Sequence, residues 1–188
     1  MAKCIGRFVF IALILVLAVS VFGQTKTSDV RIEIKNSQFY LSSKLVKLPI
    51  TANELEKIIG KPDRSLEGVN KVSTWDKLGL VGYQKLGSDD YHEIGIVLDV
   101  KENKFEFNPS NTFQGSFIID GVRVTPASSL NSLNQGKKGA KFKPIPFVKI
   151  LSEYRSGNVY MVMWQTEKAK VIGDAKILQI SISKAEAK

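Results

Sequence analysis

The chain has 188 residues, and its 27 lysines and arginines against 18 aspartates and glutamates give a formal net charge of +9 at pH 7. Its single cysteine excludes the class of small secreted domains that depend on several disulfides. The basic excess is dispersed along the chain. It favours an acidic partner or an anionic glycan or lipid surface, or it serves solubility alone.

The N-terminus has the three parts of a secretory signal peptide. Lys3 and Arg7 precede the apolar run 8–22, fifteen residues that are interrupted by one serine. Gly23 then supplies a small residue before an expected cleavage at Gln24. Because the run is shorter than the roughly 20 residues that span a bilayer, the pattern favours cleavage over a transmembrane anchor.

Removal of the signal peptide, residues 1–23, also removes Cys4, so the mature chain is expected to hold no thiol and no disulfide. We expect a single α+β domain at 24–183 and a solvated tail at 184–188. An exported protein without disulfides favours a bacterial periplasm or cell surface. In that compartment we expect no nucleic-acid partner, and after cleavage no membrane span.

The first part of the mature chain predicts three strands. Residues 30–35 alternate strictly between polar and apolar side chains, as a half-buried strand does. Segments 38–41 and 44–48 are separated by two serines, which predicts a hairpin that leads into the next element.

The next element is the clearest helix in the sequence. Thr51 and Glu54 have the spacing of a capping box, in which each side chain binds the other residue's backbone N–H. Leu55, Ile58 and Ile59 then share one face. A Gly-Lys-Pro sequence follows and ends the helix. A helix of about nine residues is too short to be stable alone, so it must pack on neighbouring strands.

The rest of the chain predicts strands, loops and a second helix. We expect polar loops at 63–70 and 135–143, and a second short helix that starts at Thr125 and Pro126. Residues 147–154 fit either a helix or a strand, and the turn after them favours a strand. Further strands are expected at 71–75, 80–85, 91–100, 104–107, 115–119, 122–124, 159–165 and 175–183.

These elements predict an α+β fold, with an antiparallel sheet and two short helices packed on one face. The order strand, turn, strand, Thr-capped helix occurs at 39–51, and a similar order occurs at 117–125. This suggests a weak internal duplication. The alternative is that any α+β chain alternates in this way.

The sequence offers few residues for catalysis or metal binding. His92 is the only histidine, and Asp89, Asp90 and Glu93 lie beside it. A metal site needs at least three converging ligands, and this segment supplies two at most on one face. No Gly-x-Ser-x-Gly nucleophile motif is present. We therefore expect no metal, no cofactor and no catalytic residue.

The sequence does contain candidate residues for binding a partner or ligand. Aromatic side chains at strand ends can anchor a partner or cover the core. The lysine-rich loop can clamp an acidic ligand or glycan, or it can be a solvated loop. The candidates are Trp75, Asp76, Tyr83, Lys137, Lys138, Lys141, Lys143 and Trp164.

Three motifs together resemble an uncharacterised bacterial domain family. They are Ile-Ile-Gly-Lys-Pro-Asp-Arg at 58–64, Trp-Asp-Lys-Leu-Gly-Leu at 75–80, and Phe-Gln-Gly-Ser-Phe-Ile-Ile-Asp-Gly at 113–121. The Gly-Lys-Pro ending is also similar to small outer-membrane assembly lipoproteins and to the β-lactamase-inhibitor-like fold. That similarity implies a helix pair on an antiparallel sheet, and neither resemblance implies an activity.

The sequence therefore favours an exported, non-enzymatic protein that binds another protein, as an inhibitor, an immunity factor or an envelope component. The first alternative is a binder of a small acidic ligand or glycan through residues 137–143. A hydrolase that uses His92 is the least favoured of the three.

Overall fold

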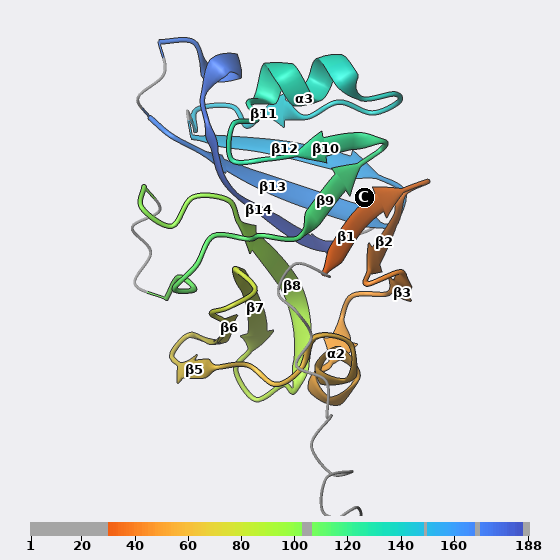
Figure 1. Ribbon diagram of the computed structural model, residues 1–188, viewed down its shortest axis with the longest axis vertical. Coiled ribbons are helices and arrows are strands. Elements are labelled where there is room, and N and C mark those ends of the chain that lie inside the picture. The colour runs from red at the N-terminus through yellow and green to blue at the C-terminus, as the bar shows by residue number, and fades with distance from the viewer. Residues whose placement is uncertain (1–29, 103–106, 149, 168–169, 186–188) are drawn as a thin grey trace, which may run out of the picture.

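The protein, seen in a computed structural model, is built from two β-sheets that pack face to face, with a short helix at each end (Figure 1). The structure describes residues 30–102, 107–148, 150–167 and 170–185. The expected signal peptide at 1–23 lies outside these residues.

The smaller sheet has five strands in the order β10-β9-β1-β2-β3. Neighbouring strands are antiparallel except β1 and β9, which run parallel with Ile32 opposite Phe117. The parallel pair arises because the chain builds half of the other sheet before it returns as β9. The strands are β1 (Arg31–Lys35), β2 (Gln38–Leu41), β3 (Lys44–Val46), β9 (Ser116–Ile119) and β10 (Val122–Val124).

The larger sheet has nine strands, and every pair in it is antiparallel. Its order is β11-β12-β13-β14-β8-β7-β6-β5, and β4 pairs with β8. The strands are β4 (Ile50–Thr51), β5 (Arg64–Glu67), β6 (Asn70–Trp75), β7 (Leu80–Lys85), β8 (Asp90–Val97), β11 (Lys143–Pro144), β12 (Leu151–Ser156), β13 (Val159–Gln165) and β14 (Ile177–Lys184).

One hydrophobic core fills the space between the sheets. Strand side chains alternate between the two faces, so one set from each strand enters the core. Ile32 and Ile34 contribute from the smaller sheet, and Ile94, Ile96 and Ile182 contribute from the larger one; all five are fully buried. The opposite side chains of the larger sheet form what we call the outer face.

Helix α2 (Ala52–Ile59) confirms the predicted capping box. The backbone N–H of Glu54 donates to the Thr51 hydroxyl oxygen, and the N–H of Thr51 donates to the Glu54 carboxylate, both at 3.3 Å. Leu55 and Ile59 are buried, and Ile58 is partly buried against the core. The apolar face therefore seals the core beside β4.

Helix α3 (Leu130–Gly136) begins later than predicted. Thr125 does not cap a helix, because it forms a turn in which its N–H donates to the Ser128 hydroxyl oxygen at 2.9 Å. Ser129 is the actual N-cap, and it forms a capping box with Ser132. Leu130 and Leu133 are buried. A short 3₁₀ turn, η2 (Ile172–Asp174), lies against α3.

The predicted α+β class with two short helices and mainly antiparallel strands is confirmed, but the strands form two sheets instead of the one predicted, and β1 and β9 run parallel. The helices lie at opposite ends of the molecule instead of side by side on one face (Figure 1). The expected loop at 63–70 contains β5, an exposed edge strand. The favoured strand at 147–154 starts only at Leu151. Most of the expected strand at 104–107 lies outside the described residues.

The C-terminal tail was predicted from residue 184, but Lys184 still belongs to β14. Residues 186–188 lie outside the described part of the chain. Within the described residues, no helix combines the length and the apolar character that crossing a membrane requires.

Candidate functional site

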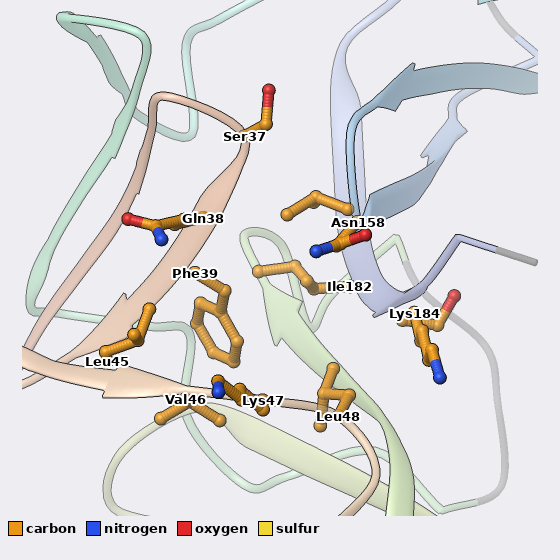
Figure 2. Close-up of a pocket in the computed structure, with 12 residues that line it drawn as sticks. Ser37, Gln38, Phe39, Leu45, Val46, Lys47, Leu48, Asn158, Ile182 and Lys184 are labelled. Atoms are coloured by element: carbon orange, nitrogen blue, oxygen red, sulfur yellow. The ribbon is translucent and has the colours of Figure 1, made fainter.

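A groove of about 370 Å³ opens where the edge of the smaller sheet meets the ends of β13 and β14. Its apolar floor combines core residues of both sheets. Figure 2 shows Phe39, Val46 and Leu48 on one side and Ile182 with Asn158 on the other. The volume is in the range of binding pockets for small molecules or single side chains.

The groove exists because β3 is short. Phe39 of β2 lies opposite Val46 of β3, and both belong to the core. After Val46 the chain leaves the sheet and turns toward β4, so no further described strand pairs with β3, although both side chains are themselves almost fully buried. In the described part of the chain, β3 is the last strand of its sheet. Its outer edge therefore presents unpaired backbone N–H and C=O groups beside the groove.

The rim of the groove is basic. Lys47 and Lys184 are exposed and line it from opposite sheets, with Gln38 and Asn158 as neutral polar neighbours. None of the described residues that line the groove is acidic. An apolar floor between two lysines fits a ligand that joins an apolar group to negative charge.

Trp75, nominated as an anchor for a partner, is a core residue instead. Its side chain is almost fully buried, and its ring lies 5.6 Å from that of Tyr91. The indole N–H donates to the carbonyl oxygen of Gly60 at 2.8 Å. Trp75 therefore ties the C-terminal end of α2 to β6 and offers little surface to a partner.

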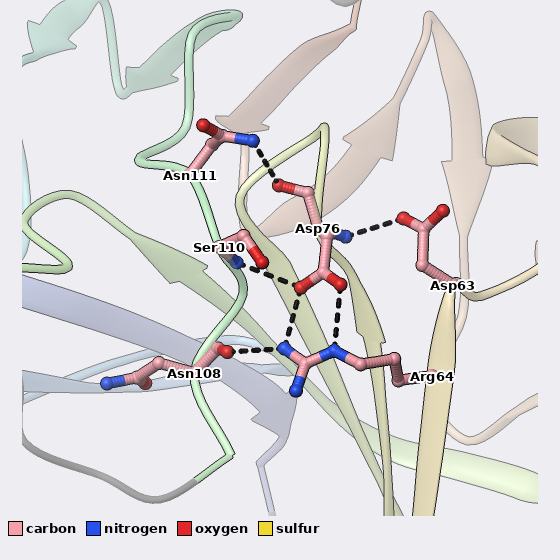
Figure 3. Close-up of polar contacts among 6 residues, drawn as sticks. All are labelled: Asp63, Arg64, Asp76, Asn108, Ser110 and Asn111. Carbon is pink, nitrogen blue, oxygen red and sulfur yellow. Dashed lines mark hydrogen bonds and ion pairs between the residues drawn. The ribbon is translucent and has the colours of Figure 1, made fainter.

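Asp76 is also occupied within the fold. Arg64 donates to its carboxylate through two nitrogens, at 2.8 and 2.7 Å, and to the Asn108 carbonyl oxygen at 2.8 Å (Figure 3). The hydrogen bonds from Arg64 lower the pKa of Asp76. The guanidinium also lies over the Phe107 ring, 5.3 Å from its centroid.

The turn at Asp76 also forms hydrogen bonds with two other segments of the chain. The N–H of Ser110 donates to the Asp76 carboxylate at 2.8 Å, and the Asn111 side chain donates to the Asp76 carbonyl oxygen at 3.1 Å. The N–H of Asp76 in turn donates to Asp63 at 2.7 Å. Asp76 therefore holds together the segments around residues 63, 76 and 110, and it is structural.

These three segments lie within a region that matches a known family model. The family model described as "Domain of unknown function (DUF7738)" matches residues 31–134, which is more than half of the chain. The chain belongs to this family. The match includes the three motifs at 58–64, 75–80 and 113–121. No curated protein and no solved structure matches the chain.

The second and third motifs of the DUF7738 domain are also in direct contact. Gly79 has φ +70°, and a Cβ there would lie 2.2 Å from the backbone nitrogen of Phe113. Only glycine fits both the backbone conformation and this approach. The motifs of the DUF7738 region thus describe a folding unit, and the similarity to outer-membrane lipoproteins stays a prediction.

Tyr83 and Trp164 lie on the outer face of the larger sheet, where both are half-buried. Trp164 is opposite Gln179 in the register of β13 and β14. Burial raises the pKa of Tyr83, and a hydrogen bond with Gln179 partly offsets this effect. The structure therefore brings these two predicted residues to the same face of the DUF7738 protein, away from the groove.

The lysine-rich segment is not a solvated loop throughout. The side chain of Lys137 is fully buried, forms an ion pair with Asp120, and lies 4.2 Å from the Tyr154 ring centroid. Burial lowers the pKa of Lys137, and burial also raises the pKa of Tyr154 to about 12. The Tyr154 hydroxyl donates to Asp120 at 2.9 Å. This cluster joins the β9–β10 turn, the end of α3 and β12.

Of the remaining lysines in this segment, Lys141 donates to the backbone carbonyl oxygens of Asn134 and Lys137, so it closes the end of α3. Lys138 and Lys143 are exposed. The four nominated lysines therefore do not converge on one ligand site.

His92 lies on β8 and is partly buried, and its Nε2 atom has no hydrogen-bond partner among the described residues. The described part of the chain contains no group of three metal-ligating side chains.

The groove of the DUF7738 protein was not found from the sequence. Phe39 and Val46 have the pattern of ordinary core residues, and Ile182 lies far away near the C-terminus. Nothing local indicates that these residues meet at a surface opening.

Proposed function

We propose that this chain is an exported, non-enzymatic protein that binds an extended segment of another protein in the groove between β3 and the ends of β13 and β14. One observation carries the proposal: the free edge of β3 runs beside an apolar groove of about 370 Å³. Strand addition at such an edge supplies backbone hydrogen bonds, and the neighbouring pocket supplies selectivity.

The chemistry of the rim defines the expected partner. A bound strand would place alternate side chains over the floor, and an aliphatic or aromatic side chain would contact Leu45, the exposed apolar residue of the lining. Acidic residues next to it would face Lys47 and Lys184. The partner is therefore an acidic, extended polypeptide segment with one buried apolar residue. An inhibitor, an immunity factor or an envelope component would act through such a contact.

Export is the second part of the proposal, and the N-terminal sequence supports it. Cleavage after Gly23 would give a mature protein that begins at Gln24, placed in the periplasm or at the cell surface. Intact-mass measurement of the protein purified from the envelope fraction tests this. A mass that includes residues 1–23, or recovery only from the cytoplasm, would refute it.

The charge complementarity can be tested with a matched pair of variants. The double variant Lys47→Glu/Lys184→Glu reverses the rim, while Lys77→Glu/Lys85→Glu makes the same charge change on exposed lysines elsewhere. We expect partner recovery from envelope extract to fall at least tenfold for the rim variant alone. Equal recovery with both variants would exclude the groove as the binding site.

We also propose that the fold contains an internal duplication. Hairpins β2–β3 and β9–β10 lie in the same sheet, and each is followed by a capped helix. This shared order supports a common origin of the two units.

A further inference from the structure

The outer face of the larger sheet carries a row of four side chains that lie directly opposite one another on neighbouring strands. Tyr160 of β13 is opposite Ser183 of β14, which is opposite Glu93 of β8, which is opposite Tyr83 of β7. Directly opposed residues of antiparallel strands project to the same side, with Cβ atoms about 5 Å apart. A carboxylate therefore stands in one line with two tyrosine rings. We call this row the Glu93 site.

The next row of the sheet has a glycine beside the carboxylate, and the Val81 side chain lies 2.6 Å from where a Cβ of that glycine would be. Gly95 lies opposite both Ser181 and Val81, so one position in the middle of the face has no side chain. The Gln179 amide lies in that space, 2.8 Å from where a Cβ of Gly95 would be, and it donates to the Ser181 hydroxyl oxygen at 3.1 Å. The polar groups of Gln179 and Ser181 beside Glu93 therefore already hydrogen-bond to each other.

Glu93 itself lacks a counter-charge. No lysine, arginine or histidine of the described chain forms an ion pair with it, and burial raises the pKa of its carboxyl group, which a hydrogen bond with Ser181 partly offsets. Burial is the main cause of the raised pKa values of Tyr83 and Tyr160; the charge of Glu93 adds to both, and at Tyr160 the hydrogen bond with Glu153 contributes more. A partly desolvated carboxylate without a cation costs stability.

One ring of the site already binds a cation. The Arg155 guanidinium lies 4.9 Å from the Tyr160 ring centroid, and the Tyr160 hydroxyl donates to Glu153 at 3.1 Å. This arrangement shows that the face accommodates a positive group against an aromatic ring. Within the described residues, no lysine or arginine lies over the ring of Tyr83, which is on the other side of Glu93.

We propose that Glu93, together with the ring of Tyr83 directly opposite it, binds the primary ammonium group of an amine ligand. The carboxylate supplies the counter-charge that the fold omits, and the Tyr83 ring supplies cation–π contact and a desolvated setting. The site lies on the outer face and is independent of the groove. Two sources share this chemistry: a free alkylamine and a lysine side chain of a polypeptide.

The binding test uses n-butylammonium as the probe and 1-butanol as its neutral control, followed through the backbone NMR signals of Gly95 and Ser181. We expect saturable shifts with butylammonium and none with butanol. Glu93→Gln should weaken binding at least tenfold, whereas Glu67→Gln, on the exposed edge strand β5, should leave it unchanged. A capped lysine dipeptide forms a second arm: binding as tight as butylammonium or tighter assigns the site to a polypeptide, and weaker binding assigns it to a free amine.

A stability measurement separates a binding role from a structural one. If Glu93 serves a ligand, the isosteric Glu93→Gln variant removes an unpaired charge and its melting temperature should equal or exceed that of the wild type. A lower melting temperature would show that the carboxylate is needed for folding. That result, equal shifts with butanol, or equal butylammonium affinity in Glu93→Gln, would each overturn the proposal.

Discussion

Arg64 holds the carboxylate of Asp76 in a two-point hydrogen-bonded ion pair, with N···O distances of 2.8 and 2.7 Å. The pair joins the first family motif to the second, and the carboxylate also accepts from the N–H of Ser110 in the loop that leads to the third. Residues of the motifs at 58–64 and 75–80 therefore help to lock three separate segments together.

This lock makes Asp76 a sensitive position. Replacement of Asp76 by alanine leaves the N–H of Ser110 and the Arg64 guanidinium without their acceptor, which we expect to lower the free energy of unfolding by about 2 kcal/mol. Urea denaturation measures this. The control is Asp174→Ala, an exposed residue of η2 whose side chain accepts one hydrogen bond, from Asn131. A loss for Asp76→Ala no larger than the control's would contradict the structural role.

The same pair predicts how stability depends on pH. The pKa of Asp76 is lowered by Arg64; at Asp99 burial raises the pKa, but the hydrogen bond from Lys176 contributes to a net lowering. Because both folded-state pKa values lie below the unfolded ones, their stabilisation is complete above about pH 4 and is lost as the pH falls further. In Asp76→Asn the decline between neutral pH and pH 3 should be shallower. A decline as steep as in the wild type would show that Asp76 is not responsible.

The buried ion pair between Lys137 and Asp120 predicts that the effect of replacing Lys137 depends on whether Asp120 keeps its charge. Lys137→Met leaves Asp120 without its cation and should cost about 3 kcal/mol of stability. Adding Asp120→Asn should recover part of that loss, since no charge then remains unpaired. The exposed Lys138→Met is the control and should change stability by less than about 0.5 kcal/mol. The single variant Asp120→Asn completes the comparison. If the double variant loses as much free energy of unfolding as the two single variants together, Lys137 and Asp120 do not stabilise each other.

Local sequence signals predicted the start of one helix correctly and missed the start of the other. Thr51 and Glu54 make their capping box within one turn, so their spacing was sufficient to predict α2. The Asp-Gly turn at 120–121 has φ +48° and +86°, the conformation that a tight hairpin needs. Thr125 misled because a Thr-Pro pair fits a helix start, whereas the real cap at Ser129 resembles ordinary loop sequence.

Features that depend on distant residues could not be predicted. Polar strand β5 has no hydrophobic pattern, since all of its residues are exposed at the sheet edge. The burial of Lys137 depends on Asp120 and Tyr154, which neighbouring sequence does not reveal. Of the nominated binding residues, Tyr83 and Trp164 share a face because β7 and β13 are brought into one sheet by β8 and β14.

The groove is the central claim, and site-specific photo-crosslinking tests it most directly. A photoreactive phenylalanine analogue at Leu45, which is 46% exposed and lines the groove, is compared in living cells with the same analogue at Val69, which is 92% exposed and far from it in the fold. The account predicts that position 45 alone crosslinks to one protein, through an acidic, extended segment with an apolar residue at its centre. Crosslinking of a partner from position 69 and none from position 45 would contradict it.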